Sequence, residues 1–102
     1  MVLQVQRSDE DGVALFSLAG EFAFEESPGV RSAVFDALTD SEVREVVVDL
    51  ADVSFIDSTG IGTLAVAHRV GGDSCPVRVV NPTPAVRRIL DVTGVLGILT
   101  GK

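Results

Sequence analysis

The sequence predicts a single α/β domain whose sheet is mixed, mostly parallel and four to five strands across. Two patterns lead to this prediction. Short β-branched runs alternate with segments whose apolar residues recur at helical spacing, which gives the order β-β-α-β-α-β-α. Two apolar runs near the start are separated only by an acidic turn, which indicates a hairpin. Strands that alternate with helices pair in parallel through right-handed crossovers, so the hairpin adds an antiparallel edge.

The strands are predicted from β-branched and alternating runs bounded by turn residues. The acidic residues 8–12, which end in Gly, form the turn of the hairpin, and residues 20–26 form a loop. Residues 95–99 are a short apolar tail that we expect to pack on the sheet as a last strand. The remaining predicted strands are residues 3–7, 13–18, 46–50 and 76–80.

Three helices are predicted between and after these strands. Ser27-Pro28 and Thr83-Pro84 each open a helix, because a hydroxyl accepts bonds from free backbone N–H groups and Pro suits the first helical position. The middle helix covers residues 58–70 and is stopped by two glycines, as Gly94 stops the last. Each predicted helix has a stripe of residues at helical spacing that we expect to face inward. In the order of the three helices, these are Val30, Ala33, Val34, Ala37 and Leu38; Ile61, Leu64, Ala65 and His68; and Val86, Ile89 and Leu90.

The composition bounds the kind of protein. The chain has 102 residues, of which 46% are apolar, enough for one core across residues 1–102 without disulfides or metals. A net charge of −7 with eight Lys and Arg argues against binding to nucleic acid or anionic lipid, and fits a partner with a basic surface.

The same composition gives no sign of a cofactor, a metal site or export. His68 and Cys75 are the single residues of their types, so no multi-residue metal site is expected, and both are predicted to pack. No P-loop motif is present. The start lacks a basic segment followed by an apolar run, and no apolar stretch would cross a bilayer. We therefore expect a cytoplasmic monomer without a cofactor.

The most informative segment is residues 49–62, DLADVSFIDSTGIG, which leads from a buried strand through a loop into a helix. Ser58 is placed about where the helix begins, where free N–H groups and the helix dipole favour an anion. A phosphate on Ser58 could be held by those amides and would add about −1.5 to −2 charges beside Asp57. Gly60 and Gly62 leave the first helical turn without side chains, so a partner can approach its backbone closely. Each Gly lowers helix stability by about 1 kcal/mol relative to Ala.

Simpler interpretations of these residues stay open at this point. Ser58 can be no more than a helix cap, and Asp57 a loop carboxylate that favours the dipole. Gly60 and Gly62 can serve close packing of the helix on the sheet. Nearby, Phe22 and Phe24 alternate in an acidic loop, where they either cap the core or project as an anchor for a partner.

The longer run VVVDLADVSFIDSTGIG, residues 46–62, resembles the central motif of STAS-domain anti-sigma factor antagonists. Weaker similarities cover nearly the whole chain. LAGE at residues 18–21 resembles the motif after the family's second strand, and NPTPAVRRIL at residues 81–90 resembles its third helix. VTGV at residues 92–95 resembles the short motif at the end of the family's pattern. The resemblance implies the STAS fold.

The resemblance also implies a protein-binding switch rather than an enzyme. Ser58 matches the residue phosphorylated by a cognate anti-sigma factor that is also a serine kinase, and Thr59 matches a secondary phosphorylation position. The unmodified antagonist binds this kinase and frees its sigma factor, the phosphorylated form lets go, and a separate serine phosphatase restores it. The implied docking residues are Glu21, Asp57, Ser58, Thr59, Gly60, Ile61 and Gly62.

One position departs from the family's pattern. Many antagonists carry an Asp, implicated in kinase contact, where this chain has Ala23. The departure indicates either a divergent partner or a different role. A second hypothesis is therefore a STAS scaffold or sensor module that binds a protein or small ligand without phosphorylation. A third, a small enzyme that uses Asp57 and Ser58, would need a base beside Ser58, and His68 lies about three turns along the helix.

Overall fold

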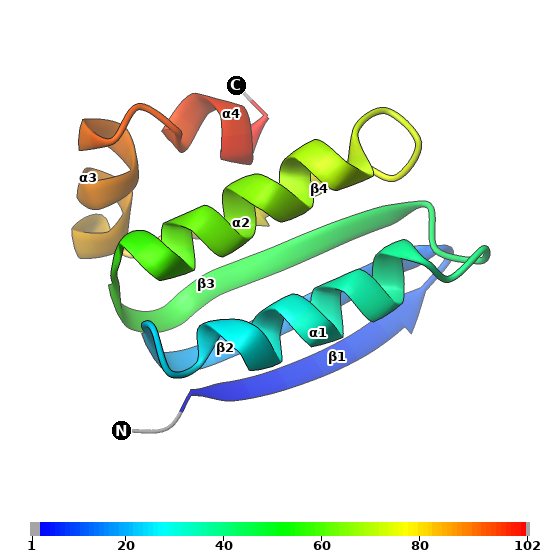
Figure 1. Ribbon diagram of the computed structural model, residues 1–102, viewed down its shortest axis with the longest axis horizontal. Helices are drawn as coiled ribbons and strands as arrows, with labels where there is room; N and C mark the ends of the chain where they lie inside the picture. Colours follow the sequence, from blue (N-terminus) through cyan, green and yellow to red (C-terminus); the bar gives the residue numbers. More distant parts are fainter. Residues whose placement is uncertain (1–2, 102) are drawn as a thin grey trace.

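The computed structural model describes residues 3–101 and confirms the predicted α/β fold (Figure 1). One four-stranded sheet has the order β1-β2-β3-β4, in which β1 is antiparallel to β2 and the other neighbours are parallel. The elements are β1 (Gln4–Glu10), β2 (Val13–Phe22), α1 (Ser27–Leu38), β3 (Glu45–Ile56), α2 (Ser58–Gly71), β4 (Val77–Val80), α3 (Pro84–Val92) and α4 (Leu96–Thr100).

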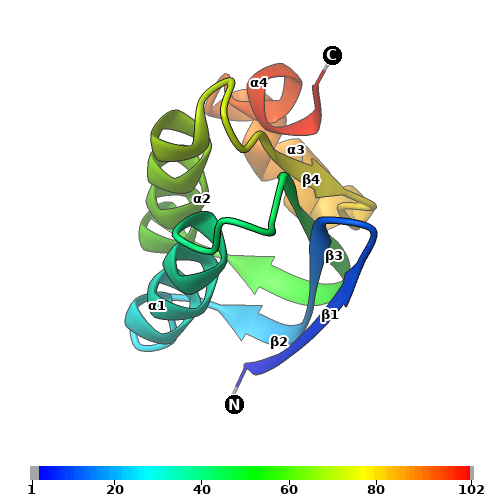
Figure 2. The same cartoon turned by 90° about the vertical axis from the view of Figure 1, so that its right-hand side faces the viewer.

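The helices are divided between one face of the sheet and one of its edges. Figures 1 and 2 show α1 and α2 together on the same face, whereas α3 and α4 lie towards the β4 edge. The core fills the space between the sheet and these helices, and its largest fully buried side chains are Phe16, Phe22, Leu18, Leu50, Ile56, Leu64, Leu90 and Leu99. None of the helices within residues 3–101 is long and apolar enough to span a membrane.

The hairpin turn is shorter than predicted. Glu10 pairs with Val13, so Asp11 and Gly12 alone make the turn, and the predicted turn residues 8–10 belong to β1. Both turn residues have positive φ, 54° and 83°, the backbone of a two-residue turn that matches strand twist. Residues 8–10 were not recognised as part of the strand, because they are acidic or polar and exposed and so show no apolar alternation.

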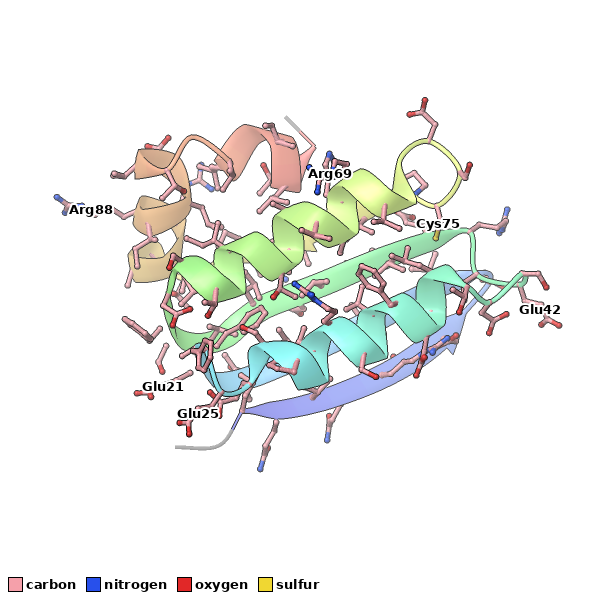
Figure 3. All side chains as sticks on the ribbon, viewed as in Figure 1. Glu21, Glu25, Glu42, Arg69, Cys75 and Arg88 are labelled. Atoms are coloured by element: carbon pink, nitrogen blue, oxygen red, sulfur yellow. The ribbon has the colours of Figure 1, made fainter. Side chains whose placement is uncertain are left out.

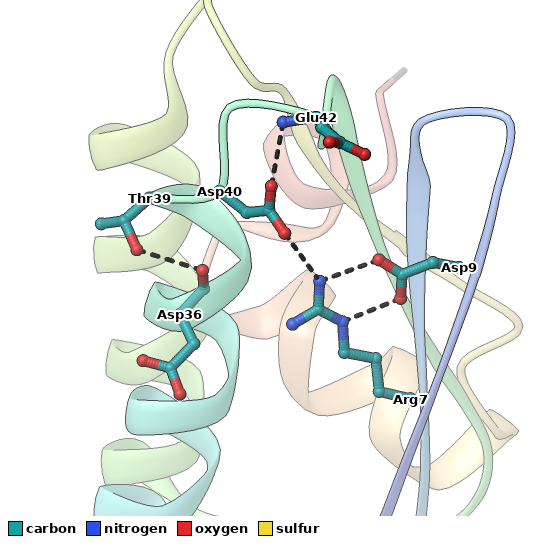
Figure 4. Close-up of polar contacts among 6 residues, drawn as sticks. All are labelled: Arg7, Asp9, Asp36, Thr39, Asp40 and Glu42. Atoms are coloured by element: carbon teal, nitrogen blue, oxygen red, sulfur yellow. Dashed lines mark hydrogen bonds and ion pairs between the residues drawn. The ribbon is translucent and has the colours of Figure 1, made fainter.

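Ionic contacts at the turn end fasten the hairpin to the connection after α1 (Figure 4). Arg7 donates twice to Asp9 at 2.8 Å, and its guanidinium lies 3.9 Å from Asp40. The same guanidinium lies 5.7 Å from the ring centre of Phe16. The acidic residues here therefore have structural partners, and no group of three or more His, Cys, Asp or Glu in residues 3–101 is arranged to hold a metal ion.

β2 and β3 both run further than predicted, to Phe22 and Ile56 rather than to residues 18 and 50. Their parallel register shifts twice, because β3 has extra residues between Asp49 and Asp52 and between Val53 and Phe55. Beyond Leu50 the buried positions of β3 are therefore three residues apart instead of two. A period of two is the signal for a strand, so the second half of β3 could not be recognised from periodicity.

α3 covers the part of β3 that β4 leaves unpaired. β4 pairs only with residues 46–49 of β3, and α3 packs beside the following residues. Thr83 caps α3 as predicted: its hydroxyl accepts from the N–H of Val86 (3.3 Å) and donates to the carbonyl of Val53 (3.3 Å). The predicted last strand is wrong, since the tail forms the short helix α4, which packs on β4 and buries Leu99.

The start of α1 also differs from the prediction. Ser27 is not the cap: it is the first helical residue, it is buried, and its hydroxyl donates to the carbonyl of Ala23 (2.9 Å). A tight turn over residues 24–26 leads straight into the helix with Glu26 already in the right-handed helical region. The single Cys is packed as predicted, and burial raises the pKa of the Cys75 thiol.

Candidate functional site

The segment singled out in the sequence lies where three chain elements meet. The carboxyl ends of the parallel strands β2 and β3 lie together, and β3 turns directly into α2 (Figure 1). The N–H of Asp57 donates to the carbonyl of Phe22 at 3.3 Å, which ties this turn to the end of β2. The edge of a parallel sheet beside a helix N-terminus is a common place for binding sites in α/β folds.

Asp57, rather than Ser58, is the cap of α2. One carboxylate oxygen accepts from the N–H groups of Thr59 and Gly60, both at 3.0 Å, and from the Thr59 hydroxyl at 2.6 Å. The other oxygen accepts from the N–H of Phe24 at 3.1 Å, across to the loop before α1. The Thr59 hydroxyl bond and then the Gly60 amide bond hold the pKa of Asp57 below its usual value. Asp57 is therefore a charged bridge between the loop and the helix.

This capping corrects the predicted phosphate cradle. Two of the amides that were expected to hold a phosphate on Ser58 are already bonded to Asp57. The negative charge favoured by the helix dipole is thus already in place. A phosphate on Ser58 would stand next to this carboxylate and would not be neutralised by those amides.

Ser58 and Thr59 differ sharply in their surroundings. Ser58 is exposed, and among the described residues its hydroxyl has no hydrogen-bond partner. Thr59 is half-buried, its hydroxyl is bonded to Asp57, and its oxygen lies 3.4 Å from that of Ser27. The Ser58 hydroxyl is therefore accessible from outside, whereas the Thr59 hydroxyl is bonded inside the turn.

The two glycines of α2 also have different roles. A Cβ on Gly60 would lie 2.7 Å from the carbonyl oxygen of Phe22 and 2.8 Å from Cγ1 of Ile56, so Gly60 allows close packing on the end of β2. At Gly62 a Cβ would meet no atom within 4 Å. Gly60 and Ile61 are buried, which excludes them from a contact surface of the free chain, whereas Gly62 stays accessible.

Three further side chains are exposed near the ends of β2 and β3 and in the loop before α1. Glu21 is exposed at the end of β2 and pairs in register with Phe55, whose side chain is 46% exposed. Phe24 is 71% exposed, although its backbone is held by Asp57. Phe22 lies in the core, as one of the two predicted roles requires, whereas Phe24 projects from it. Sequence reasoning missed Phe55, whose exposure follows from the register shift in β3.

Ala23 and His68 have structural roles. The carbonyl of Ala23 accepts three bonds, from the N–H groups of Glu26 (3.1 Å) and Ser27 (3.1 Å) and from the Ser27 hydroxyl (2.9 Å). His68 is half-buried, as predicted, and its Nδ1–H donates to the carbonyl of Val77 at 3.1 Å. His68 is thus engaged with β4, and it lies about three turns along α2 from Ser58.

Comparison with known proteins decides the family. A family model described as the STAS domain matches residues 4–102, almost the whole chain. This chain belongs to the STAS domain family. The predicted resemblance is therefore confirmed, and the central motif, residues 46–62, covers most of β3 and the first turn of α2.

The relatives of this STAS domain include several anti-sigma factor antagonists. An anti-sigma F factor antagonist of Paenibacillus polymyxa is 28% identical over 103 residues, which cover 97% of this chain and 86% of the relative. The crystal structure of an anti-sigma factor antagonist from Mycobacterium paratuberculosis is 31% identical, with a TM-score of 0.84 over 92% of this chain and 80% of that one.

A third relative shares the fold. The anti-sigma factor antagonist SpoIIAA in its unphosphorylated form has a TM-score of 0.79 at 22% identity, over 97% of this chain and 85% of that one. Its phosphorylated form has a TM-score of 0.73 at 21% identity, over 97% and 88% of the two chains.

Asp57→Ala is expected to destabilise this STAS domain at neutral pH, because it leaves the amides of Thr59, Gly60 and Phe24 without their acceptor. A carboxyl group with a lowered pKa stabilises the fold above its ordinary pKa of 3.8, and this contribution is lost as pH falls through the folded-state value. Urea unfolding from pH 7 to pH 3 should show the difference from wild type narrowing only below about pH 4. Asp52→Ala, at an exposed position of β3, is the control. A difference that does not change with pH would show that the charge of Asp57 contributes nothing.

Proposed function

We propose that this protein is an anti-sigma factor antagonist that binds an anti-sigma factor serine kinase while Ser58 is unmodified, and that phosphorylation of Ser58 releases it. Binding frees the sigma factor held by the kinase, and a serine phosphatase restores the unmodified form. The observation that carries the proposal is the exposed Ser58 hydroxyl on a helix start that Asp57 holds in place. The full-length similarity to anti-sigma factor antagonists supports the same role.

The docking surface in this proposal consists of the exposed or half-buried residues around the switch. These are Glu21, Phe24, Phe55, Asp57, Ser58 and Gly62, with Thr59 supporting the turn from inside. The net charge of −7 and the two carboxylates fit a basic partner surface. Phosphorylation would add about −1.5 to −2 charges beside Asp57. A partner surface fitted to the unmodified hydroxyl would have to accommodate the bulk of this group and desolvate its charge.

The kinase is proposed to act on Ser58 and not on Thr59. A kinase must reach the hydroxyl oxygen, and the Thr59 hydroxyl donates to Asp57 inside a half-buried turn. Phosphorylation there would require breaking a bond that helps to hold α2 and the loop before α1 together. The phosphorylated form of SpoIIAA, which has this fold, is consistent with a switch of the same kind.

In this proposal the protein is a substrate and a ligand, not a catalyst. His68 lies about three turns along α2 from Ser58, and the Asp57 carboxylate beside Ser58 is already bonded to the Thr59 hydroxyl and to three backbone N–H groups. The mechanism needs neither a metal nor a cofactor. We propose that the chain acts in the cytoplasm, where a sigma factor works, and as a monomer.

The test combines phosphorylation and binding with the cognate kinase. Tryptic residues 45–69 carry the whole motif on one peptide, so mass spectrometry after incubation with kinase and ATP locates the phosphate. We expect phosphate on Ser58, none in Ser58→Ala, and tight binding of Ser58→Ala. Ser58→Asp should weaken binding at least about tenfold, since a misplaced charge in an interface costs more than 1 kcal/mol. Ser41→Asp, which adds the same charge in an exposed loop distant in sequence, should bind as wild type does.

Two results would contradict the proposal. Phosphate on Thr59 alone would keep the switch and move it by one residue. If the peptide stays unmodified while both Ser58 variants bind the kinase as wild type does, phosphorylation has no role. The unphosphorylated scaffold or sensor module would then be the better assignment.

A further inference from the structure

A groove of about 640 Å³ runs between α1 and α2 on the helical face of the molecule. This α1–α2 groove is lined mainly by Phe24, Pro28, Arg31, Phe35, Gly62 and Val66. Its volume lies within the range of small-molecule sites, which is about 300–1,000 Å³. Such sites are mostly apolar with a few polar groups that orient the ligand, so the polar groups of this groove determine what it could bind.

Three of the four hydroxyl groups that line the groove are already used inside the chain, whereas the hydroxyl of Ser32 forms no hydrogen bond within the described residues. Ser27 donates to the carbonyl of Ala23 (2.9 Å), Thr59 donates to Asp57 (2.6 Å), and Thr63 donates to the carbonyl of Thr59 (2.9 Å). Their hydrogens are not available to a ligand. The floor of the groove therefore offers mainly apolar contact to anything that enters it.

Arg31 is the one charged residue among the described residues that line the groove. Within the described chain its guanidinium forms neither an ion pair nor a hydrogen bond; those of Arg69, Arg87 and Arg88 are equally unpaired, but these residues do not line the groove. A guanidinium offers a planar pair of N–H donors that matches a carboxylate. One free cation beside an apolar floor fits a ligand with one anionic group and an apolar body.

Gly62 is a second observation at the groove, and it is shared with the proposed docking surface. It lies inside a helix, where Gly is less stable than Ala by about 1 kcal/mol. Neither packing nor backbone strain accounts for it, because an added Cβ would meet no atom within 4 Å and its φ is not positive. The effect of the missing side chain is to leave the groove open beside α2.

We infer that the α1–α2 groove binds a small amphipathic carboxylate, with the carboxylate on Arg31 and the apolar chain between Phe35, Gly62 and Val66. A single anchoring charge and the limited volume favour a small molecule over a protein segment. The inference does not depend on phosphorylation of Ser58, and its test needs no kinase, so the two can fail separately.

The test is titration of the ¹⁵N-labelled protein with sodium dodecanoate below its micelle concentration, followed by amide shifts. We expect saturable shifts centred on Gly62, Val66 and Phe35. Arg31→Gln should weaken binding about fivefold, the value of a partly exposed ion pair. Gly62→Leu should abolish it by filling the groove. Arg88→Gln is the matched control, because Arg88 projects from α3 away from the α1–α2 pair (Figure 3).

Three outcomes would overturn the inference. Dodecanoate that causes no saturable shift shows that the groove is not a site for this chemistry. Shifts located elsewhere, or equal affinities of Arg31→Gln and Arg88→Gln, show that Arg31 does not anchor the ligand. Equal affinity for dodecyltrimethylammonium, which has the same chain and the opposite charge, shows that the groove does not select a carboxylate. Spectra of each variant without ligand establish that it is folded.

Discussion

Gly60→Ala should destabilise the protein by about 2 kcal/mol and lower its Tm by about 10 °C. The new Cβ would lie 2.7 Å from the carbonyl oxygen of Phe22, and a backbone atom at the end of β2 cannot move aside without shifting the strand. It would also lie 2.8 Å from the fully buried side chain of Ile56. The intrinsic preference of a helix for Ala, worth about 1 kcal/mol, offsets only part of this repulsion.

Gly62→Ala is the matched control for this prediction, two residues along the same helix. Its Cβ meets no atom within 4 Å, so only the helix preference acts and the protein should become up to about 1 kcal/mol more stable. Thermal unfolding of the two variants beside wild type measures both changes. If the two substitutions shift Tm in the same direction, close packing of Gly60 on β2 is not what sets its identity.

Phe24→Ala should lower the affinity for the anti-sigma factor about thirtyfold, the effect of removing an interface residue worth about 2 kcal/mol. The side chain is 71% exposed, yet its own backbone N–H is held by Asp57 at 3.1 Å. An exposed aromatic on a fixed backbone loses little conformational freedom on binding, which is the property of an interface anchor. This prediction assumes the proposed partner.

Stability should hardly change in the same variant, because an exposed side chain that leaves the core intact is worth less than about 0.5 kcal/mol. Val92→Ala provides the control: Val92 is 79% exposed and apolar, but it lies on α3. Isothermal titration calorimetry of both variants against the kinase separates the two positions. An unchanged affinity of Phe24→Ala, or an equal loss in Val92→Ala, would place the docking surface elsewhere.

The regular elements could be predicted because each has a local cause. Asp11-Gly12 forms the hairpin turn, Thr83-Pro84 caps and opens α3, and the β-branched residues at 46–48 form a buried strand. These signals depend on neighbours within a few residues, so they can be recognised from the sequence without the tertiary structure. The motif at residues 46–62 also located the candidate site and its family before the structure was known.

The predictions failed where a distant contact decides the outcome. A short apolar run does not show whether it forms a strand or a helix. Residues 96–100 form a helix, which packs on β4 and α3. The second half of β3 lost its alternation through its register shifts against β2. Ser27 does not cap α1, because the preceding turn brings the carbonyl of Ala23 close enough to accept a hydrogen bond from its hydroxyl.

By itself the sequence determined the order of elements, the family and the segment that carries the candidate site. Only the tertiary structure showed which residues of that segment cap the helix, which are exposed and which are packed. The loop before α1 gives Asp57 a partner 33 residues away, and the end of β2 lies against Gly60 but not against Gly62. These two contacts join atoms far apart in the chain, so no spacing within residues 49–62 encodes them. The bond that holds the Thr59 hydroxyl inside the turn is local, because Asp57 lies two residues away.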